Sequence, residues 1–263
     1  MYQASKPVVI KIGGALLKEE KTLEAFWPAL KKLADNEPVI LVHGGGPQST
    51  AMARRLGHEP KIVNGRRVTS DLDLSILQWT ICGELNTKLV ARALKHNIKA
   101  VGLTGIDGAT LQVHRRPPWD IDGQKVDFGW VGDVEAVDPT LLHTLISNNL
   151  VPIVAPLGID NSGQTFNVNA DTVAHGIAVA VNAGALLLVT DAGGVRKEAS
   201  NAQTRIPQMD VTHFERGKNE GWIKDGMLVK LKMAFAARDA GVSSVYILPP
   251  EDIYNRTLGT EIN

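Results

Sequence analysis

The segment Val8-Val-Ile-Lys-Ile-Gly-Gly14 is a short aliphatic run that ends in two glycines. Similar runs recur along the 263 residues, with helix-like stretches between them. They are Pro38-Val-Ile-Leu-Val, Ala100-Val-Gly-Leu, Val151-Pro-Ile-Val, Ala185-Leu-Leu-Leu-Val and Ser244-Val-Tyr-Ile-Leu. Helices cover both faces of a parallel sheet, so its strands have continuous apolar sequences. We therefore predict an α/β fold with a largely parallel central sheet.

Two segments between these runs are predicted to be helical. In Thr22–Ala34, apolar residues recur every three or four positions, which is typical of a surface helix that covers a sheet. Asp71–Lys95 predicts a longer helical region with Ser70 or Asp71 as its N-cap, and Gly83 is a point where it breaks or kinks.

The segment Leu111–Val134 has a different pattern, with short alternating apolar groups and turn-forming residues between them. It predicts hairpins added to an edge of the sheet. A helical pattern returns in Asp171–Asn182, directly before the most apolar strand. We place a lobe boundary there, so that residues 1–182 form one lobe and residues 183–263 form another.

Composition excludes several classes of protein. Lys+Arg and Asp+Glu both number 28, so no bulk charge attracts the chain to nucleic acid or to a membrane. The one cysteine, Cys82, excludes an internal disulfide and a cysteine-based zinc site, and we interpret it as a core residue. The start of the chain lacks the pattern of a signal peptide, and no apolar run approaches the roughly 20 residues of a membrane span. We expect a cytoplasmic protein with small-molecule partners and no metal site of its own.

Glycine-rich elements follow the predicted strands and stand at the start of one helix. They are Lys11–Gly14, His43–Gly46, Asp191–Gly194 and Asp225–Lys230. Without a Cβ atom, glycine lets backbone N–H groups approach a phosphate closely. One such loop is most often an ordinary tight turn, but four of them, two with a lysine, indicate a polyanion site.

Other signatures for nucleotide binding or hydrolysis are absent. The sequence has neither a Gly-x-x-x-x-Gly-Lys-Ser/Thr run nor a Gly-x-Gly-x-x-Gly after a strand, which disfavours a P-loop or a dinucleotide fold. His43-Gly-Gly-Gly is similar to an esterase oxyanion loop, but no Gly-x-Ser-x-Gly elbow supplies a nucleophile. A hydrolase is therefore disfavoured.

Five motifs together resemble those of the acetylglutamate kinases in the amino acid kinase family, in the same order and over nearly the whole chain. They are Lys11–Gly14, His43–Gly46, Asn64–Thr69, Asn167–Asp171 and Asp225–Lys230. The resemblance implies a three-layer sandwich with an acceptor-binding N-terminal lobe and a nucleotide-binding C-terminal lobe. It also implies that ATP and Mg²⁺ are used to convert the side-chain carboxylate of N-acetyl-L-glutamate to an acyl phosphate in arginine biosynthesis.

The resemblance assigns roles to individual residues. By similarity, Lys11 and Lys230 bracket the phosphoryl group in transfer, and Asp171 holds both lysines. The residues assigned to the acceptor are Gly45, Gly46, Arg67 and Asn167. Those assigned to the nucleotide are Gly13, Gly14, Asp191, Gly193, Gly194, Trp222, Ile223 and Lys224.

The chemistry agrees with these roles. A carboxylate acceptor is already ionised at neutral pH, so it needs no general base, only relief from charge repulsion with the triphosphate. Asp171 is thus an orienter of cations, and it is also a candidate N-cap of the helix that follows. We interpret His43 as a structural hydrogen-bonding residue. Arg66 remains an alternative to Arg67 as the partner of an acceptor carboxylate.

The acyl end of the acceptor is the open part of the assignment. Where the family often has a basic residue, this chain has Ile106, and Arg115-Arg116 either meet an extra carboxylate or form a solvated pair, which we favour because exposed arginine is common. N-succinylglutamate and a carrier-bound aminoadipate are alternative acceptors, and a non-catalytic sensor is an alternative function. Only Met1–Lys6 precede the first strand, too few residues for the extra helix of arginine-inhibited relatives, so the resemblance implies a homodimer.

Overall fold

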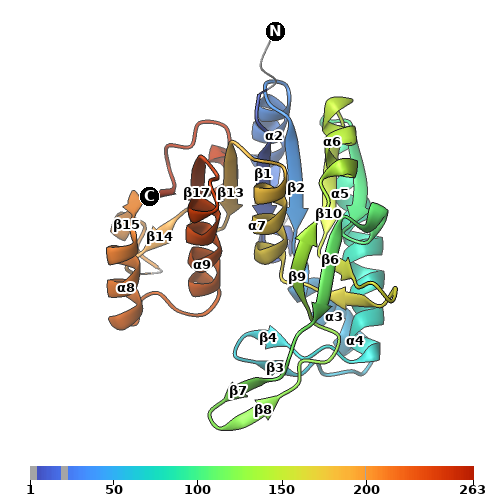
Figure 1. The fold of residues 1–263 in the computed structure, drawn as a ribbon. Coiled ribbons are helices and arrows are strands. Elements are labelled where there is room, and N and C mark those ends of the chain that lie inside the picture. Colours follow the sequence, from blue (N-terminus) through green and yellow to red (C-terminus); the bar gives the residue numbers. More distant parts are fainter. Residues whose placement is uncertain (1–4, 19–22, 199) are drawn as a thin grey trace.

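The central sheet is the main feature of the computed structural model, which describes residues 5–18, 23–198 and 200–263 (Figure 1). In this described part, eight strands lie in the order β16-β18-β17-β13-β1-β2-β10-β5. Their bounds are β16 (Gln208–Met209), β18 (Thr260–Ile262), β17 (Ser244–Leu248), β13 (Ala185–Val189), β1 (Val8–Ile12), β2 (Val39–His43), β10 (Val151–Ala155) and β5 (Ala100–Thr104). Each pair from β17 to β5 is parallel, and only β18 runs antiparallel to its neighbour β17 within the described sheet. The predicted parallel α/β sheet and its six predicted strands are confirmed.

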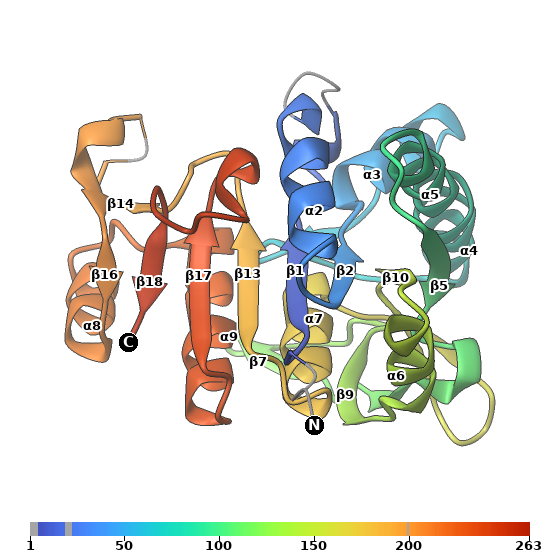
Figure 2. The same ribbon diagram turned by 90° about the horizontal axis from the view of Figure 1, so that it is seen from above.

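Helices cover both faces of this sheet, which gives three layers (Figure 2). One face packs on α2 (Phe26–Ala34) and α5 (Asn86–Lys95), and the other on α6 (Thr140–Ser147), α7 (Ala170–Ala180) and α9 (Asp225–Asp239). The remaining longer helices are α3 (Gly46–Arg55), α4 (Asp71–Leu77) and α8 (Val211–Asn219). Successive side chains of a strand point to opposite faces, so Val9 packs with the second group of helices and Val8 and Ile10 with the first. Lys11 follows Val9 by two positions and therefore faces α7 and α9.

The predicted long helical region is present, with a change of winding inside it. Ser70 is the N-cap of α4, and its hydroxyl and the Asp73 carboxylate form a reciprocal capping box. The helix then widens into a π-helical segment, η2 (Gln78–Leu85), before α5 begins. Gly83 lies inside that segment, so the chain changes its winding there and does not break. In the other predicted helix, α2 starts at Phe26, and Thr22 lies outside the described residues.

The segment Leu111–Val134 does form hairpin strands, but the prediction that they extend the central sheet is wrong. β6 (Leu111–Arg115) and β9 (Gly132–Val137) pair in a second sheet with β11 (Leu157–Ile159) and β12 (Thr165–Asn167), in the order β12-β11-β6-β9. β7 (Trp119–Ile121) and β8 (Gln124–Val126) form a separate ribbon. The chain leaves the central sheet at Gly105, where a Cβ atom would come within 2.2 Å of the Leu157 carbonyl oxygen, so only glycine permits this turn.

A further two-stranded ribbon, β3 (Ile62–Val63) with β4 (Arg66–Arg67), lies beside β7–β8 at the bottom of Figure 1. Short pairs also form between β14 (Val195–Arg196) and β15 (Arg205–Ile206). The four 3₁₀ turns within the described residues that complete the element order are η1 (Leu16–Lys18), η3 (Asp107–Ala109), η4 (Ala202–Thr204) and η5 (Pro250–Asp252). The proposed lobe boundary falls between α7 and β13, and the central sheet continues across it through the β1–β13 pair. Among the residues described here, no helix is long and apolar enough to cross a membrane.

Candidate active site

A cavity of about 370 Å³ opens where β1, β2 and β10 end. Its lining comes from the end of β1, the glycine loop 44–46, the β3–β4 ribbon, η2, Arg116 and the start of α7. Open α/β sheets bind ligands beyond the carboxyl ends of their strands, and this volume lies within the range of small-molecule sites. The cavity is therefore the candidate active site.

Lys11 and Asp171 line the inner end of the cavity, and Lys230 joins them from outside its lining through its contact with Asp171. Oδ1 of Asp171 lies 3.0 Å from Nζ of Lys11 and 3.1 Å from Nζ of Lys230. Lys11 comes from β1, Asp171 from the first turn of α7 and Lys230 from α9, and all three are buried. The structure thus brings together the three predicted catalytic residues from positions up to 219 residues apart in the chain.

The electrostatics of this group are set by burial and by mutual attraction. Burial lowers the pKa of Lys11 to about 8, with a further contribution from the Lys230 charge, although Asp171 opposes both effects. Burial alone would raise the pKa of Asp171, but the two ammonium groups hold it at about 2. Asp171 is therefore ionised at neutral pH, whereas the pKa of Lys11 lies close to neutral pH.

Asp171 is not the N-cap of α7, contrary to one of the sequence interpretations. Asn169 has that role, because its side-chain oxygen accepts hydrogen bonds from the backbone N–H groups of Asp171 and Thr172. This cap leaves the Asp171 carboxylate free for the lysines, at a helix end where negative charge is favoured.

The glycine loop brings the backbone of two elements together at the cavity. Gly45 precedes α3, whose first turn has backbone N–H groups without intrahelical partners. A Cβ atom on Gly45 would lie 2.7 Å from Ile81, and one on Gly14 would lie 3.0 Å from the Cα atom of Gly45. These glycines are required by close approach, since neither has a φ angle in the left-handed region. Gly46 is exposed and also lines the cavity.

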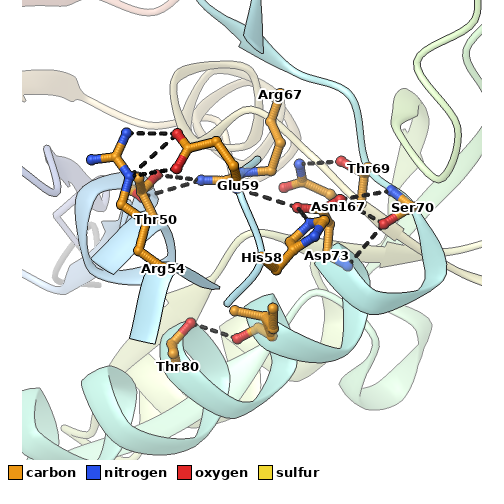
Figure 3. A network of polar contacts seen from close by, with 12 residues as sticks. Thr50, Arg54, His58, Glu59, Arg67, Thr69, Ser70, Asp73, Thr80 and Asn167 are labelled. Carbon is orange, nitrogen blue, oxygen red and sulfur yellow. Dashed lines mark hydrogen bonds and ion pairs between the residues drawn. The ribbon is translucent and has the colours of Figure 1, made fainter. Parts of the chain in front are cut away.

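Arg67 lies in the side wall of the cavity and is held by several groups (Figure 3). Its Nη2 donates to Oγ1 of Thr50 at 2.6 Å and to the Gly46 carbonyl at 3.4 Å, and its Nη1 lies 3.4 Å from Oδ1 of Asp73. Asn167 lines the same wall. All four predicted acceptor residues are thus brought together around one space: Gly45, Gly46, Arg67 and Asn167.

Asp73 is a residue of this site that the sequence analysis did not identify. Its Oδ2 accepts hydrogen bonds from the hydroxyl and the backbone N–H of Ser70. Its Oδ1 lies between Arg67 and His58, at 3.1 Å from Nε2 of His58 (Figure 3). Burial opposes ionisation of Asp73, but its hydrogen bonds with Ser70 and the nearby His58 lower its pKa. The spacing of Ser70 and Asp73 in a capping box is the signal that identifies it in sequence.

Arg115 and Arg116 differ, and the interpretation of both as a solvated pair is wrong for Arg116. Arg115 is half exposed and pairs with Asp127 at the surface. Arg116 is buried, lines the cavity and makes a two-pronged contact with Asp133, with Nε and Nη2 both bonded to Oδ1 at 3.0 and 2.6 Å. Neighbouring residues of an extended chain point to opposite sides, which explains the difference.

His43 and Cys82 have structural positions. His43 is fully buried at the end of β2, where Nδ1 lies 2.9 Å from the Gly44 carbonyl oxygen and Nε2 lies 3.0 Å from Nδ2 of Asn86. Nδ1 therefore donates and Nε2 accepts, and burial lowers the pKa of His43 to about 4. The predicted hydrogen bonds of His43 are thus present. Cys82 packs on a small buried cluster, and burial raises the pKa of its thiol to about 12.

The residues assigned to the nucleotide lie outside the cavity, with Gly14 as an exception. Gly13 lies beside Lys11, since a Cβ atom there would be 3.9 Å from Nζ of that lysine. The loop after β13 contains Gly193 and Gly194, both with positive φ angles, and Asp191 is exposed on it. Before α9, Ile223 is buried in the core, Trp222 is half-buried and Lys224 is exposed. The side chain of Ile223 is therefore not available to a ligand.

Comparison with known proteins gives one consistent family. A model of the amino acid kinase family matches residues 6–249. The chain is 40% identical over 247 residues to the acetylglutamate kinase of Anaeromyxobacter dehalogenans strain 2CP-C, covering 92% of this chain and 91% of that protein. It is 37% identical over 243 residues to the acetylglutamate kinase of Methanothrix thermoacetophila, covering 92% and 84%.

Solved structures have the same fold at lower identity. The structure of smu.665 from Streptococcus mutans UA159 superposes with a TM-score of 0.82 at 24% identity. That of carbamate kinase from Giardia lamblia bound to AMP-PNP superposes with a TM-score of 0.69 at 19% identity. Both comparisons cover 98% of each chain, so the whole architecture is shared.

Proposed function

Because the chain belongs to the amino acid kinase family, we propose that it transfers the γ-phosphoryl group of ATP to the side-chain carboxylate of N-acetyl-L-glutamate, in arginine biosynthesis. The product is an acyl phosphate. The relatives at 34–40% identity that cover most of the chain are acetylglutamate kinases, which supports this acceptor.

The observation that carries the proposal is the pair of ammonium groups held by one buried carboxylate at the inner end of the cavity. Phosphoryl transfer to a carboxylate brings two anions together, and negative charge then moves towards the bridging and leaving oxygens. Lys11 and Lys230 are placed to stabilise that charge, and Asp171 fixes their positions without adding a base. The acceptor is ionised before it reacts, so no proton has to be removed.

The remaining cavity residues support one orientation of the acceptor. We propose that its side-chain carboxylate lies near Lys11 and the N–H groups of Gly14 and Gly45. Its α-carboxylate then lies towards Arg67 and Asn167, because a guanidinium group suits planar recognition of a carboxylate. Residues 1–182 thereby form the acceptor lobe.

We propose that the nucleotide binds on residues 183–263, with its phosphates directed to Lys230 and Gly13. The supporting features are the glycine loop after β13 and the turn before α9. Mg²⁺ enters as part of the substrate, the MgATP complex. Mg²⁺ is commonly held by substrate phosphates together with one or two carboxylates, so it needs no cluster of protein ligands.

We also propose that the protein is a homodimer in the cytoplasm, where ATP is supplied. Trp79 on η2 and Leu72 on α4 belong to the same helical region. Their exposed fractions are 57% and 44%, which is high for apolar side chains. Large exposed apolar side chains mark a subunit contact where they belong to one contiguous patch, and these two residues are candidates for such a contact. Sedimentation equilibrium should give a mass of about twice 28.3 kDa, and a monomer or a hexamer would contradict the proposal.

The acceptor is tested by ADP release from MgATP, with hydroxylamine added to trap the acyl phosphate as a hydroxamate. N-acetyl-L-glutamate should give both signals. N-acetyl-L-glutamine is the matched control, because an amide replaces the carboxylate and no hydroxamate should form. Absence of turnover with N-acetyl-L-glutamate and other acylated or free amino acids would refute the kinase and favour a sensor.

A further inference from the structure

Arg66 is a half-buried cation of the outer cavity that lacks a carboxylate of its own. It lines the cavity from β4, and the centre of its guanidinium group lies 4.8 Å above the ring of Trp119 on β7. Among the described residues, no Asp or Glu is within ion-pair distance of Arg66. This sets Arg66 apart from the other two arginines of the cavity.

The other two arginines are already matched with carboxylates. Arg67 lies against Asp73, and Arg116 forms its two-pronged contact with Asp133. Arg116 is also stacked on Trp119, at 4.6 Å from the ring centre, on the same ring as Arg66. Among the described residues, three guanidinium groups therefore face this end of the cavity with two carboxylates, which leaves one positive charge in excess.

The excess charge is at Arg66. Burial lowers the pKa of its guanidinium group, and the nearby Arg116 lowers it further, while the Asp133 charge has a smaller effect in the opposite direction. A half-buried cation in such surroundings gains stability when an anion binds beside it. Trp119 supports the flat face of the guanidinium group and leaves its N–H edge available for an oxygen ligand.

We propose that Arg66, on the Trp119 ring and beside Arg116, forms a second anion subsite that binds a carboxylate at the end of the acceptor's acyl group. The inference rests on the proposed function and refines it. N-acyl-L-glutamates whose acyl chain ends in a carboxylate are then better acceptors than neutral acyl-glutamates of the same length. The side-chain carboxylate meets the lysines, the α-carboxylate meets Arg67, and the acyl carboxylate meets Arg66.

The test compares two acceptors that differ only in charge. N-succinyl-L-glutamate has a terminal carboxylate on its acyl group, and N-succinamoyl-L-glutamate has a terminal amide of the same size. For the unmodified protein, kcat/KM should be about 10–100-fold higher for the succinyl compound, as expected for one charge-assisted contact. A ratio close to one would overturn the proposal.

Variants assign this preference to Arg66. In Arg66→Leu the ratio should fall to about one, and in Arg66→Lys, which keeps the charge without the planar stack, it should be intermediate. Arg115→Leu is the matched control, because it removes the same charge from a neighbouring residue that pairs with Asp127 outside the cavity. Its ratio should equal that of the unmodified protein. An equal loss of kcat/KM for both acceptors in Arg66→Leu would show that Arg66 meets the α-carboxylate, and the subsite would be wrong.

Calorimetry without ATP separates this proposal from the proposed function. If no acylglutamate is phosphorylated, the kinase assignment fails, but the relative affinities of the two compounds still test the subsite. Tighter binding of N-succinyl-L-glutamate that is lost in Arg66→Leu or reduced in Arg66→Lys would support it. Equal affinities in the unmodified protein would overturn it. Thermal melting of each variant shows that the compared proteins are folded.

Discussion

The Lys11→Met variant should lose activity and gain stability at the same time. Methionine is similar to lysine in length but has no charge, so it removes one of the two ammonium groups on Asp171 and keeps the packing of the buried strand. Removal of one preorganised charge donor is expected to reduce kcat by about 10²–10³-fold. The KM for the acceptor should change far less, because the charge on the transferring group is largest in the transition state.

The gain in stability follows from the pKa of Lys11. Folding lowers this pKa from 10.5 to about 8, mainly through burial and despite the attraction of Asp171. At about 1.4 kcal/mol for each pKa unit, a protonated Lys11 destabilises the folded state by an amount on the order of 3 kcal/mol. The variant also leaves Asp171 with one lysine, a balanced pair. We expect its free energy of unfolding to rise by about 1–3 kcal/mol at pH 7.

The pH dependence gives an independent readout. Between pH 8 and pH 10.5 the folded protein has released the Lys11 proton while the unfolded chain still holds it, so the unfolded state binds more protons. Rising pH therefore stabilises the unmodified protein over this window, and the Lys11→Met variant should lack that contribution. Denaturant titrations at pH 7 and pH 10 measure both effects.

A matched control is Lys88→Met, which removes an exposed lysine that pairs with Glu84 on the surface. Its stability and kcat should stay close to those of the unmodified protein. The reasoning is refuted if Lys11→Met is less stable than the unmodified protein at pH 7, or if its kcat is nearly normal. In the first case Lys11 would be a structural cation, and in the second the catalytic cations would lie elsewhere.

Three further predictions concern the groups around Lys11 and Arg67. Asp171→Asn should lower kcat by a smaller factor than Lys11→Met, and its loss of activity at high pH should begin at a lower pH, because Asp171 raises the pKa of Lys11. A pH profile of kcat checks this, and an unchanged profile would contradict it. Asp73→Asn should raise the KM for N-acetyl-L-glutamate about ten-fold with kcat nearly unchanged, since the substitution removes the charge that holds the Arg67 guanidinium group. Steady-state kinetics in which only kcat falls would exclude a positioning role for Asp73. His43→Asn should keep kcat within about ten-fold between pH 6 and pH 8, because a neutral His43 is not used as a base; steady-state rates in a folded variant decide it.

The sequence predicted those parts of the fold in which the pattern of apolar residues has a single structural explanation. A strand with helices on both faces is apolar along its whole length, and Val8–Ile12 and Ala185–Val189 are buried at every position. Lys11 stands out for the same reason, because an ammonium group in such a strand needs a partner. The apolar pattern does not show which residue is that partner, since Asp171 is 160 positions away and belongs to another layer, and only the family resemblance pointed to it.

The parts that the sequence did not predict depend on contacts between distant segments. Arg115 and Arg116 are the same residue type in the same local sequence, yet only Arg116 points towards Asp133 on β9. Neighbouring side chains of an extended chain point to opposite sides, and only the position of Asp133 decides which of the two arginines is paired in the cavity. The hairpin segment also separates from the central sheet at Gly105 because of the Leu157 backbone, which lies more than 50 residues later in the chain.

The charges of the cavity suggest why its two ends use different cations. The chain as a whole is neutral, with 28 basic and 28 acidic residues, so a local excess of positive charge is a property of the site. Within the described residues, the inner end has two lysines with one carboxylate, and the outer end has three arginines with two carboxylates. A dianionic acceptor is attracted to both ends, so charge alone does not orient it. Arginine forks hold a carboxylate in one plane, whereas lysines act as compact charges that can follow a phosphoryl group as it moves. The side chain that reacts therefore belongs at the lysine end, and the carboxylates that only bind belong at the arginine end.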